Sequence, residues 1–197
     1  MIHAKPVQFL LIAFGMMLHL FLVHQNSYSK NFSTKSNYHT CFSPEGHCTN
    51  QVIALINAAK SSINMATYSF TSWPIARALL RAKQRGVSIA IVCDRSLFKD
   101  RSVIRTLMKY HIPIWVDDTV SIAHNKYLIL DKKTIETGSF NYTVSANRYN
   151  AENVLIINDP DLAQTYLSNF KHRVASSVPA AYYHYHPKPK HTRRQHQ

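Results

Sequence analysis

Short apolar runs alternate with segments of helical periodicity through residues 49–116, and this alternation most constrains the fold. The runs lie at 63–70, 87–93 and 112–116 and are rich in residues typical of buried strands. One segment between them places Ile75, Ala78 and Leu79 at helical spacing. Strands that alternate with helices predict an α/β fold in which helices sandwich a mixed, largely parallel β-sheet.

The mixed character is expected from a second pattern at residues 125–137. Two apolar runs, 125–130 and 134–137, are joined by a short polar segment that begins at Asp131. Strands joined by so short a turn form a β-hairpin, whose strands pair antiparallel. A further strand is expected at 154–157, and a last helix is expected after Pro160.

Polar groups flank this hairpin in two pairs. His124 and Lys126 stand two residues apart at its start, and Ser139 and Asn141 repeat that spacing after Gly138. Residues two apart on a strand point to the same face. The hairpin is therefore expected to bring the four side chains together at one end of the sheet.

The four side chains suit the hydrolysis of a phosphodiester. A histidine can attack phosphorus and be released by water, while lysine and asparagine hold the non-bridging oxygens and a serine hydroxyl adds a donor. They are not a set of metal ligands, because a charged lysine bears no lone pair. No metal and no cofactor is therefore expected. Tyr68 and Ser69, at the end of an expected strand, are expected to pack, and the alternative is that they line the site.

The full string reads His124-x-Lys126, four residues, Asp131, six residues, then Gly138-Ser139-x-Asn141. It is similar to the HKD motif of the phospholipase D superfamily. Stretches at 41–46, 66–71 and 151–153 also resemble the short bacterial endonucleases and phospholipases of that superfamily, which carry the motif once. The resemblance covers about residues 41–175. It implies a phospholipase D-like fold.

The resemblance also implies roles for single residues. Glu152 is expected to accept a hydrogen bond from the imidazole Nδ1–H, which leaves Nε2 free to attack. Asp131 is expected to be structural, because it lies at the turn, seven residues from His124. The single motif implies a homodimer in which two His124 rings face one phosphate. One ring would form a phosphohistidine and the other would protonate the leaving group, with Lys126 and Asn141 of both chains on the phosphoryl oxygens.

The net charge of the chain limits the classes of molecule that it is expected to bind. Lysine and arginine outnumber aspartate and glutamate by 23 to 10, which gives a formal net charge of +13. Such a chain attracts polyanions, and both nucleic acid and anionic phospholipid qualify. The first hypothesis is a non-specific endonuclease on DNA or RNA. The alternatives are a secreted phospholipase D and a non-catalytic protein that binds polyanions.

The ends of the chain differ in composition from its middle. Residues 1–29 contain a nearly continuous apolar run at 7–23, which predicts a signal peptide and export to the periplasm or medium. A membrane anchor formed by residues 7–23 is the alternative, and it would allow membrane contact. Residues 30–40 are expected to be a linker, 41–178 the catalytic domain, and 179–197 a disordered basic tail.

Two of the three cysteines are close in sequence. Cys41 and Cys48 are seven residues apart in a loop-like stretch, and in an exported protein they can form a disulfide. A small metal site with His39 and His47 is the alternative. Cys93 lies in an apolar run and is expected to be buried.

Overall fold

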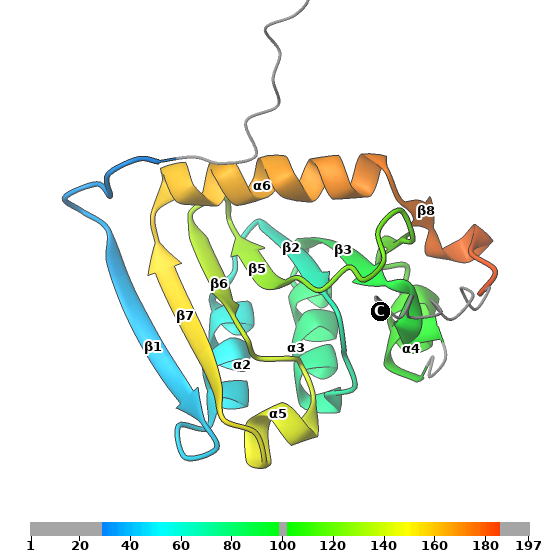
Figure 1. The fold of residues 1–197 in the computed structure, drawn as a ribbon, viewed down its shortest axis with the longest axis horizontal. Helices are drawn as coiled ribbons and strands as arrows, with labels where there is room; N and C mark the ends of the chain where they lie inside the picture. Colours follow the sequence, from blue (N-terminus) through cyan, green and yellow to red (C-terminus); the bar gives the residue numbers. More distant parts are fainter. Residues whose placement is uncertain (1–28, 99–101, 186–197) are drawn as a thin grey trace, which may run out of the picture. The chain divides into compact units, whose positions relative to one another are not determined.

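The computed structural model describes residues 29–98 and 102–185 (Figure 1). The apolar run at 7–23 and the last part of the expected tail lie outside the described residues. Among the residues that are described, no helix combines the length and the apolar character that a membrane crossing requires.

The described residues form one sheet with helices on both faces. The strands are β1 (Asn37–Ser43), β2 (Ser62–Thr67), β3 (Ser88–Asp94), β4 (Ile114–Asp117), β5 (Lys126–Leu130), β6 (Thr134–Gly138), β7 (Glu152–Asn158) and β8 (Val178–Pro179). The helices are α2 (Cys48–Ala58), α3 (Trp73–Gln84), α4 (Ser102–Lys109), α5 (Val144–Arg148) and α6 (Pro160–Ala175), with short 3-10 turns η1 (Arg95–Phe98) and η2 (Ala180–Tyr182). The strand order is β1-β7-β6-β5-β2-β3-β4-β8.

The expected mixed α/β fold is confirmed, with less parallel pairing than expected. Only β2, β3 and β4 pair parallel to one another. The hairpin β5–β6 pairs through β5 with the edge of β2 opposite β3, and this pairing is antiparallel. Strands β7, β1 and β8 are also antiparallel to their neighbours. Parallel neighbours need a crossover connection, which α3 and α4 supply between β2, β3 and β4, whereas β5 and β6 are joined by a short turn and so pair antiparallel.

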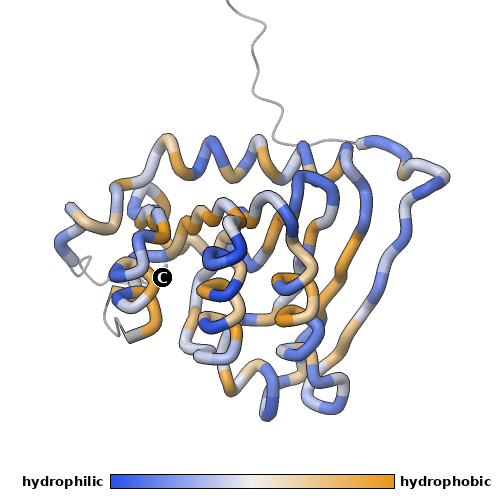
Figure 2. The backbone as a smooth tube through the Cα atoms, turned by 180° about the vertical axis from the view of Figure 1, so that it is seen from behind, coloured by the Kyte–Doolittle hydropathy of each residue, from blue (hydrophilic) through white to orange (hydrophobic). Residues whose placement is uncertain are grey.

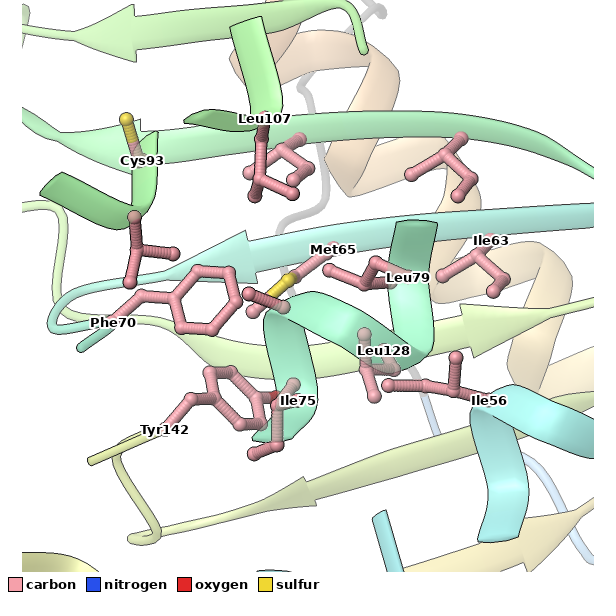
Figure 3. Packing of buried hydrophobic residues seen from close by; sticks show 14 of the residues in the cluster. Ile56, Ile63, Met65, Phe70, Ile75, Leu79, Cys93, Leu107, Leu128 and Tyr142 are labelled. Carbon is pink, nitrogen blue, oxygen red and sulfur yellow. The ribbon is translucent and has the colours of Figure 1, made fainter. Parts of the chain in front are cut away.

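Two apolar clusters hold the layers together. The larger one lies between the sheet and α2, α3 and α4, and Figure 3 shows Met65, Leu79 and Leu128 at its centre. The smaller one lies under α6, where Ile129 packs near Leu167. Figure 2 shows hydrophobic and hydrophilic segments alternating along these helices, as expected for helices with one buried side.

Local signals set the helix ends as the sequence indicates. The Ser72 hydroxyl accepts a hydrogen bond from the Ile75 backbone N–H at the start of α3, and Pro74 occupies the first turn. Gly86 follows this helix with φ of 85°, a conformation that glycine adopts without strain.

The boundaries of the ordered domain differ from those expected. Strand β1 begins at Asn37, inside the expected linker, because it pairs along its whole length with β7. Beyond residue 178, β8 pairs with β4, and Ala180 and Tyr183 are buried. The first part of the expected tail, to residue 185, is therefore part of the described fold.

Candidate active site

The ends of four strands meet at one edge of the sheet. Strand β5 begins at Lys126, β6 ends at Gly138 and β7 begins at Glu152, and these strands are antiparallel neighbours. The end of β2 lies at the same edge, because Thr67 is the pairing partner of Lys126. The hairpin therefore gathers the polar groups of its two ends at one place, as its sequence pattern predicts.

His124 and Lys126 are in direct contact at this edge. The Lys126 Nζ lies 2.7 Å from His124 Nδ1 and 3.0 Å from Nε2, and it donates to the His124 backbone oxygen at 2.8 Å. The imidazole is exposed, whereas Lys126 is only 7% exposed. Burial lowers the pKa of Lys126, and the negative charge of Glu152 opposes that shift. An exposed imidazole thus stands beside a partly desolvated cation.

Tyr68 lies against both of these groups. Its ring centroid is 4.4 Å from that of His124, with the rings tilted by 51°, and the Lys126 Nζ lies 5.1 Å from the tyrosine ring centroid. The sequence favoured packing for Tyr68 and left lining of the site as the alternative, and the structure places the ring beside His124 and Lys126. The available signal was its position just after a central strand.

Glu152 anchors the serine of the motif. Its Oε2 accepts a 2.6 Å hydrogen bond from the Ser139 hydroxyl, and its Oε1 accepts from the Asn150 amide at 2.9 Å. In the described part of the chain, no hydrogen bond joins Glu152 to His124. The carboxylate therefore holds Ser139 here, and the His124 ring is contacted by Lys126, which can only donate to it.

Gly138 allows two strands to approach closely. A Cβ at this position would lie 2.1 Å from the backbone oxygen of Asn153, a distance that no side chain can occupy. The same approach lets the Ser139 N–H donate to the Asn153 Oδ1 at 2.7 Å, while the Asn153 N–H donates to the Ser139 hydroxyl at 3.1 Å. Steric exclusion of a Cβ thus explains why a glycine occupies this position of the motif.

Asn141 is held between two buried aromatic residues. Phe140 and Tyr142 are both fully buried and fix the backbone on either side of it. The Asn141 Oδ1 is also buried, and it has no hydrogen-bond partner among the described residues. An unsatisfied buried carbonyl costs about 1–3 kcal/mol. This oxygen can only accept, so a phosphoryl oxygen would be bound by the N–H groups of the same amide.

Acidic residues at strand ends hold the loop that leads to His124. The buried Asp94 accepts hydrogen bonds from the backbone N–H groups of Ala123 and Ser96, each at 2.8 Å. Arg95 pairs with Asp118 at 2.7 Å and donates to a backbone oxygen of the same loop. These residues were not among those predicted for the site, although an aspartate at the end of an apolar strand is a signal that the sequence shows.

Asp131 lies at the opposite end of β5. Its carboxylate accepts from the backbone N–H groups of Lys60, Ser61 and Ser62 and from the Ser61 hydroxyl. Burial raises the pKa of Asp131, but these hydrogen bonds outweigh it and bring the pKa to about 2. Asp131 therefore ties the hairpin turn to the segment before β2, as expected of a structural residue.

A disulfide joins Cys41 and Cys48, and it confirms that expectation. Both sulfurs are thereby used, so the alternative metal site with His39 and His47 is wrong. Among residues 29–98 and 102–185, no cluster of three histidine, cysteine or acidic side chains is placed to hold a metal ion.

Comparison with known proteins gives consistent relatives. A family model described as cardiolipin synthase, PLD-like domain matches residues 52–174. The chain is 42% identical over 153 residues to a phospholipase D of Rickettsia prowazekii, which covers 77% of this chain and 75% of that relative. It is 31% identical over 153 residues to the mitochondrial cardiolipin hydrolase of Homo sapiens, covering 77% of this chain and 61% of that protein.

Solved structures share the architecture. The phospholipase D family member Nuc from Salmonella typhimurium superposes with a TM-score of 0.70 at 37% identity, over 74% of this chain and 98% of Nuc. NucT from Helicobacter pylori gives a TM-score of 0.67 over 74% of this chain and 99% of NucT. At 24% identity, this second likeness bears on the fold alone.

Proposed function

The chain belongs to the phospholipase D superfamily of phosphodiester hydrolases, and from that membership we propose that it cleaves DNA and RNA, without a metal ion and with little sequence preference. The observation that carries the proposal is the contact between the exposed His124 ring and the ammonium of Lys126. A nucleophile beside a fixed cation suits attack on an anionic phosphodiester.

The reaction proceeds in two steps. In the first, His124 Nε2 forms a bond to phosphorus while the bond from phosphorus to the leaving oxygen breaks, and a general acid protonates that oxygen. In the second, water attacks the phosphohistidine, its proton passes to the same group, and the nitrogen–phosphorus bond breaks. Lys126 and Asn141 hold the phosphoryl oxygens in both steps, and the Ser139 hydroxyl joins them when it turns its hydrogen from Glu152 to the phosphate.

The general acid is the partner's His124 in a homodimer. Each chain supplies one motif, and the chemistry needs both a nucleophile and an acid. A two-fold axis places identical groups opposite each other, so a single residue type fills both roles. Glu152 supports the site through Ser139 and through its charge near Lys126.

The preference for nucleic acid rests on the basic charge together with the small size of the chain and its single motif. With a net charge of +13, the protein is attracted to a polyanion along its length. No helix-turn-helix or zinc-finger pattern for reading bases occurs in the sequence. Contacts to the backbone alone give binding without sequence preference.

The second candidate is a phospholipase D that releases head groups from phospholipid. It is favoured by the names of the relatives, which are a phospholipase D in Rickettsia prowazekii and a cardiolipin hydrolase in Homo sapiens. Anionic lipid offers the same phosphodiester to the same groups. The two candidates differ in the surface around the site rather than in the chemistry.

Export of the protein is part of the proposal. The apolar run at 7–23 suits a signal peptide or an anchor, and the Cys41–Cys48 disulfide suits an oxidising compartment. Cell fractionation with mass measurement of the N-terminus tests this. A full-length, cytosolic product would contradict export.

One assay separates the candidate substrates. Purified protein is incubated in EDTA with plasmid DNA, RNA, and vesicles of phosphatidylcholine or cardiolipin, beside a His124→Ala control. Degradation of DNA and RNA, lost in the control, is expected. Hydrolysis of lipid alone would favour the second candidate, and loss of all activity in EDTA would refute the metal-independent mechanism.

A further inference from the structure

A carboxyl group lies buried directly beneath the site. Glu136, in the middle of β6, is fully buried, and the residues opposite it on the neighbouring strands are Leu128 and Ile156. Lys126 precedes Leu128 by two residues on β5, so its side chain points to the same face of the sheet as that of Leu128. Glu136, the pairing partner of Leu128, therefore lies on the face of Lys126, two residues further from the edge that carries the site. Burial raises the pKa of Glu136 to about 8, although a hydrogen bond from Tyr142 opposes the shift.

The acid has a single partner in the described residues, and that partner belongs to the motif loop. The Tyr142 hydroxyl donates to Glu136 Oε2 at 2.7 Å, while Oε1 has no hydrogen-bond partner in the described part of the chain. Tyr142 directly follows Asn141, the predicted phosphate ligand. The hydroxyl bond therefore fixes the loop that carries Asn141 from below.

Tyr142 also joins this loop to the one that carries Tyr68. Its backbone N–H donates to the Ser69 oxygen at 3.2 Å, and its backbone oxygen accepts from the N–H groups of Thr71 and Ser72 at 3.0 and 2.9 Å. Both sides of the site thus meet at one residue. Figure 3 shows the Tyr142 ring beside Phe70 and Ile75 in the core.

Packing alone does not account for the acid. The Tyr142 ring makes edge contacts with Phe70 and Phe140, and a phenylalanine would keep these contacts. A buried acid with one unpartnered oxygen destabilises the core relative to an apolar residue of similar size. The pair of Glu136 and Tyr142 therefore serves a purpose other than stability. Its place beneath the site indicates that this purpose is to position the groups of the site.

We propose that Glu136 is a positioning residue, which holds Tyr142 by its hydroxyl and thereby sets Asn141 and Tyr68 at their places around His124. This inference rests on the proposed phosphodiesterase function. It adds a residue that touches neither substrate nor the reacting atoms.

The test compares Tyr142→Phe, Glu136→Leu, their double variant and Glu136→Gln. Tyr142→Phe and Glu136→Leu are each expected to lower kcat by about 3–10 fold with KM nearly unchanged, as one lost hydrogen bond would do. Glu136→Gln keeps an acceptor oxygen and is expected to retain most of kcat. The double variant is expected to be no worse than the poorer single variant, because both remove one bond.

Tyr127→Phe is the matched control. Tyr127 is a buried tyrosine on β5 whose hydroxyl donates to Asn169 at 3.1 Å, on the α6 face. It is expected to lower the melting temperature as Tyr142→Phe does, without lowering kcat. Equal kcat in the two phenylalanine variants, or multiplicative losses in the double variant, would overturn the proposal.

Amide hydrogen exchange separates this proposal from the enzymatic one. The N–H groups of Thr71 and Ser72 are bonded to Tyr142, so they are expected to exchange faster in Tyr142→Phe than in Tyr127→Phe. This readout needs no substrate. Faster exchange in an enzyme that cleaves nothing would support the positioning and refute the function, whereas unchanged exchange would refute the positioning itself.

Discussion

Tyr68 forms a wall for the His124 ring, and its hydroxyl and its ring make separable contributions. The ring contacts both the imidazole and the Lys126 ammonium. Tyr68→Phe keeps this surface and is expected to retain kcat within about twofold, whereas Tyr68→Ala frees the imidazole and is expected to lower kcat about tenfold or more. Steady-state kinetics beside thermal melting measure this. Equal losses in both variants would place the function in the hydroxyl instead.

The buried Glu136 carboxyl makes stability depend on pH. Its pKa of about 8 in the folded protein lies above the ordinary value of 4.5, so between these values the folded state keeps a proton that the unfolded state releases. Stability therefore falls as pH rises from about 5 to 8 and levels off above that range. The difference in unfolding free energy between the wild type and Glu136→Gln should follow this course.

Chemical denaturation at a series of pH values measures that difference. Groups shared by the two proteins, such as Asp131 and Lys126, cancel in the comparison. Parallel stability profiles from pH 5 to 8 would show that the Glu136 carboxyl is already ionised in the folded protein.

The contacts of single residues differ in how well the sequence predicts them. The contact between His124 and Lys126 follows from their spacing, because neighbours in sequence remain neighbours in space. The bond expected between Glu152 and His124 depends on how β7 docks against β6, and the structure gives Glu152 the partner Ser139 instead. The pairing of Glu136 with Tyr142 is likewise tertiary, although a glutamate within an apolar strand is a visible anomaly.

Among the elements, the β5–β6 hairpin depends on its turn. Asp131 and Lys132 both adopt left-handed conformations, with φ of 52° and 55°, as a type I′ turn requires. Asp131→Asn tolerates this conformation but loses the charge that accepts four hydrogen bonds. It is expected to lower stability at pH 7 by about 1 kcal/mol, allowing for solvent screening, with kcat nearly unchanged.

Asp131 and Glu136 make stability depend on pH in opposite directions, because the folded pKa is lowered for Asp131 and raised for Glu136. The folded pKa of Asp131 is lowered to about 2 from 3.8, so its contribution is complete above pH 4 and is lost as pH falls through 2. The stability gap between the wild type and Asp131→Asn should therefore close in acid. A gap that persists at pH 2 would assign the loss to the turn geometry.

Most elements could be predicted from periodicity, but their pairing could not. The expected strands at 125–130 and 134–137 match β5 and β6 within one residue at each end. Strand β1 was not predicted at all, because residues 37–43 carry no apolar run and form a strand only by pairing with β7. Pairing partners are set by tertiary docking, which periodicity within one segment does not report.

For the whole molecule, a shared site predicts how mixed dimers behave. Wild type and His124→Ala are unfolded and refolded together in equal amounts. If one phosphate needs both histidines, mixed dimers are inactive and about a quarter of the activity remains. If each chain acts alone, about half remains, and that result would refute the shared site. Size-exclusion chromatography of the same mixture gives the oligomeric state.

The pairing of β2 with β5 determines at which point of synthesis the candidate active site can assemble. Thr67 and Lys126 meet in that pairing, and Ser139 gains its last supports only from Glu152 and Asn153. A ribosome releases a chain from its amino end, so the portion through β4 emerges first, before His124 and Lys126. The chain must therefore be synthesised past β7 before the groups around His124 can assemble. Of the described elements, only α6, β8 and the last 3-10 turn then remain to be made.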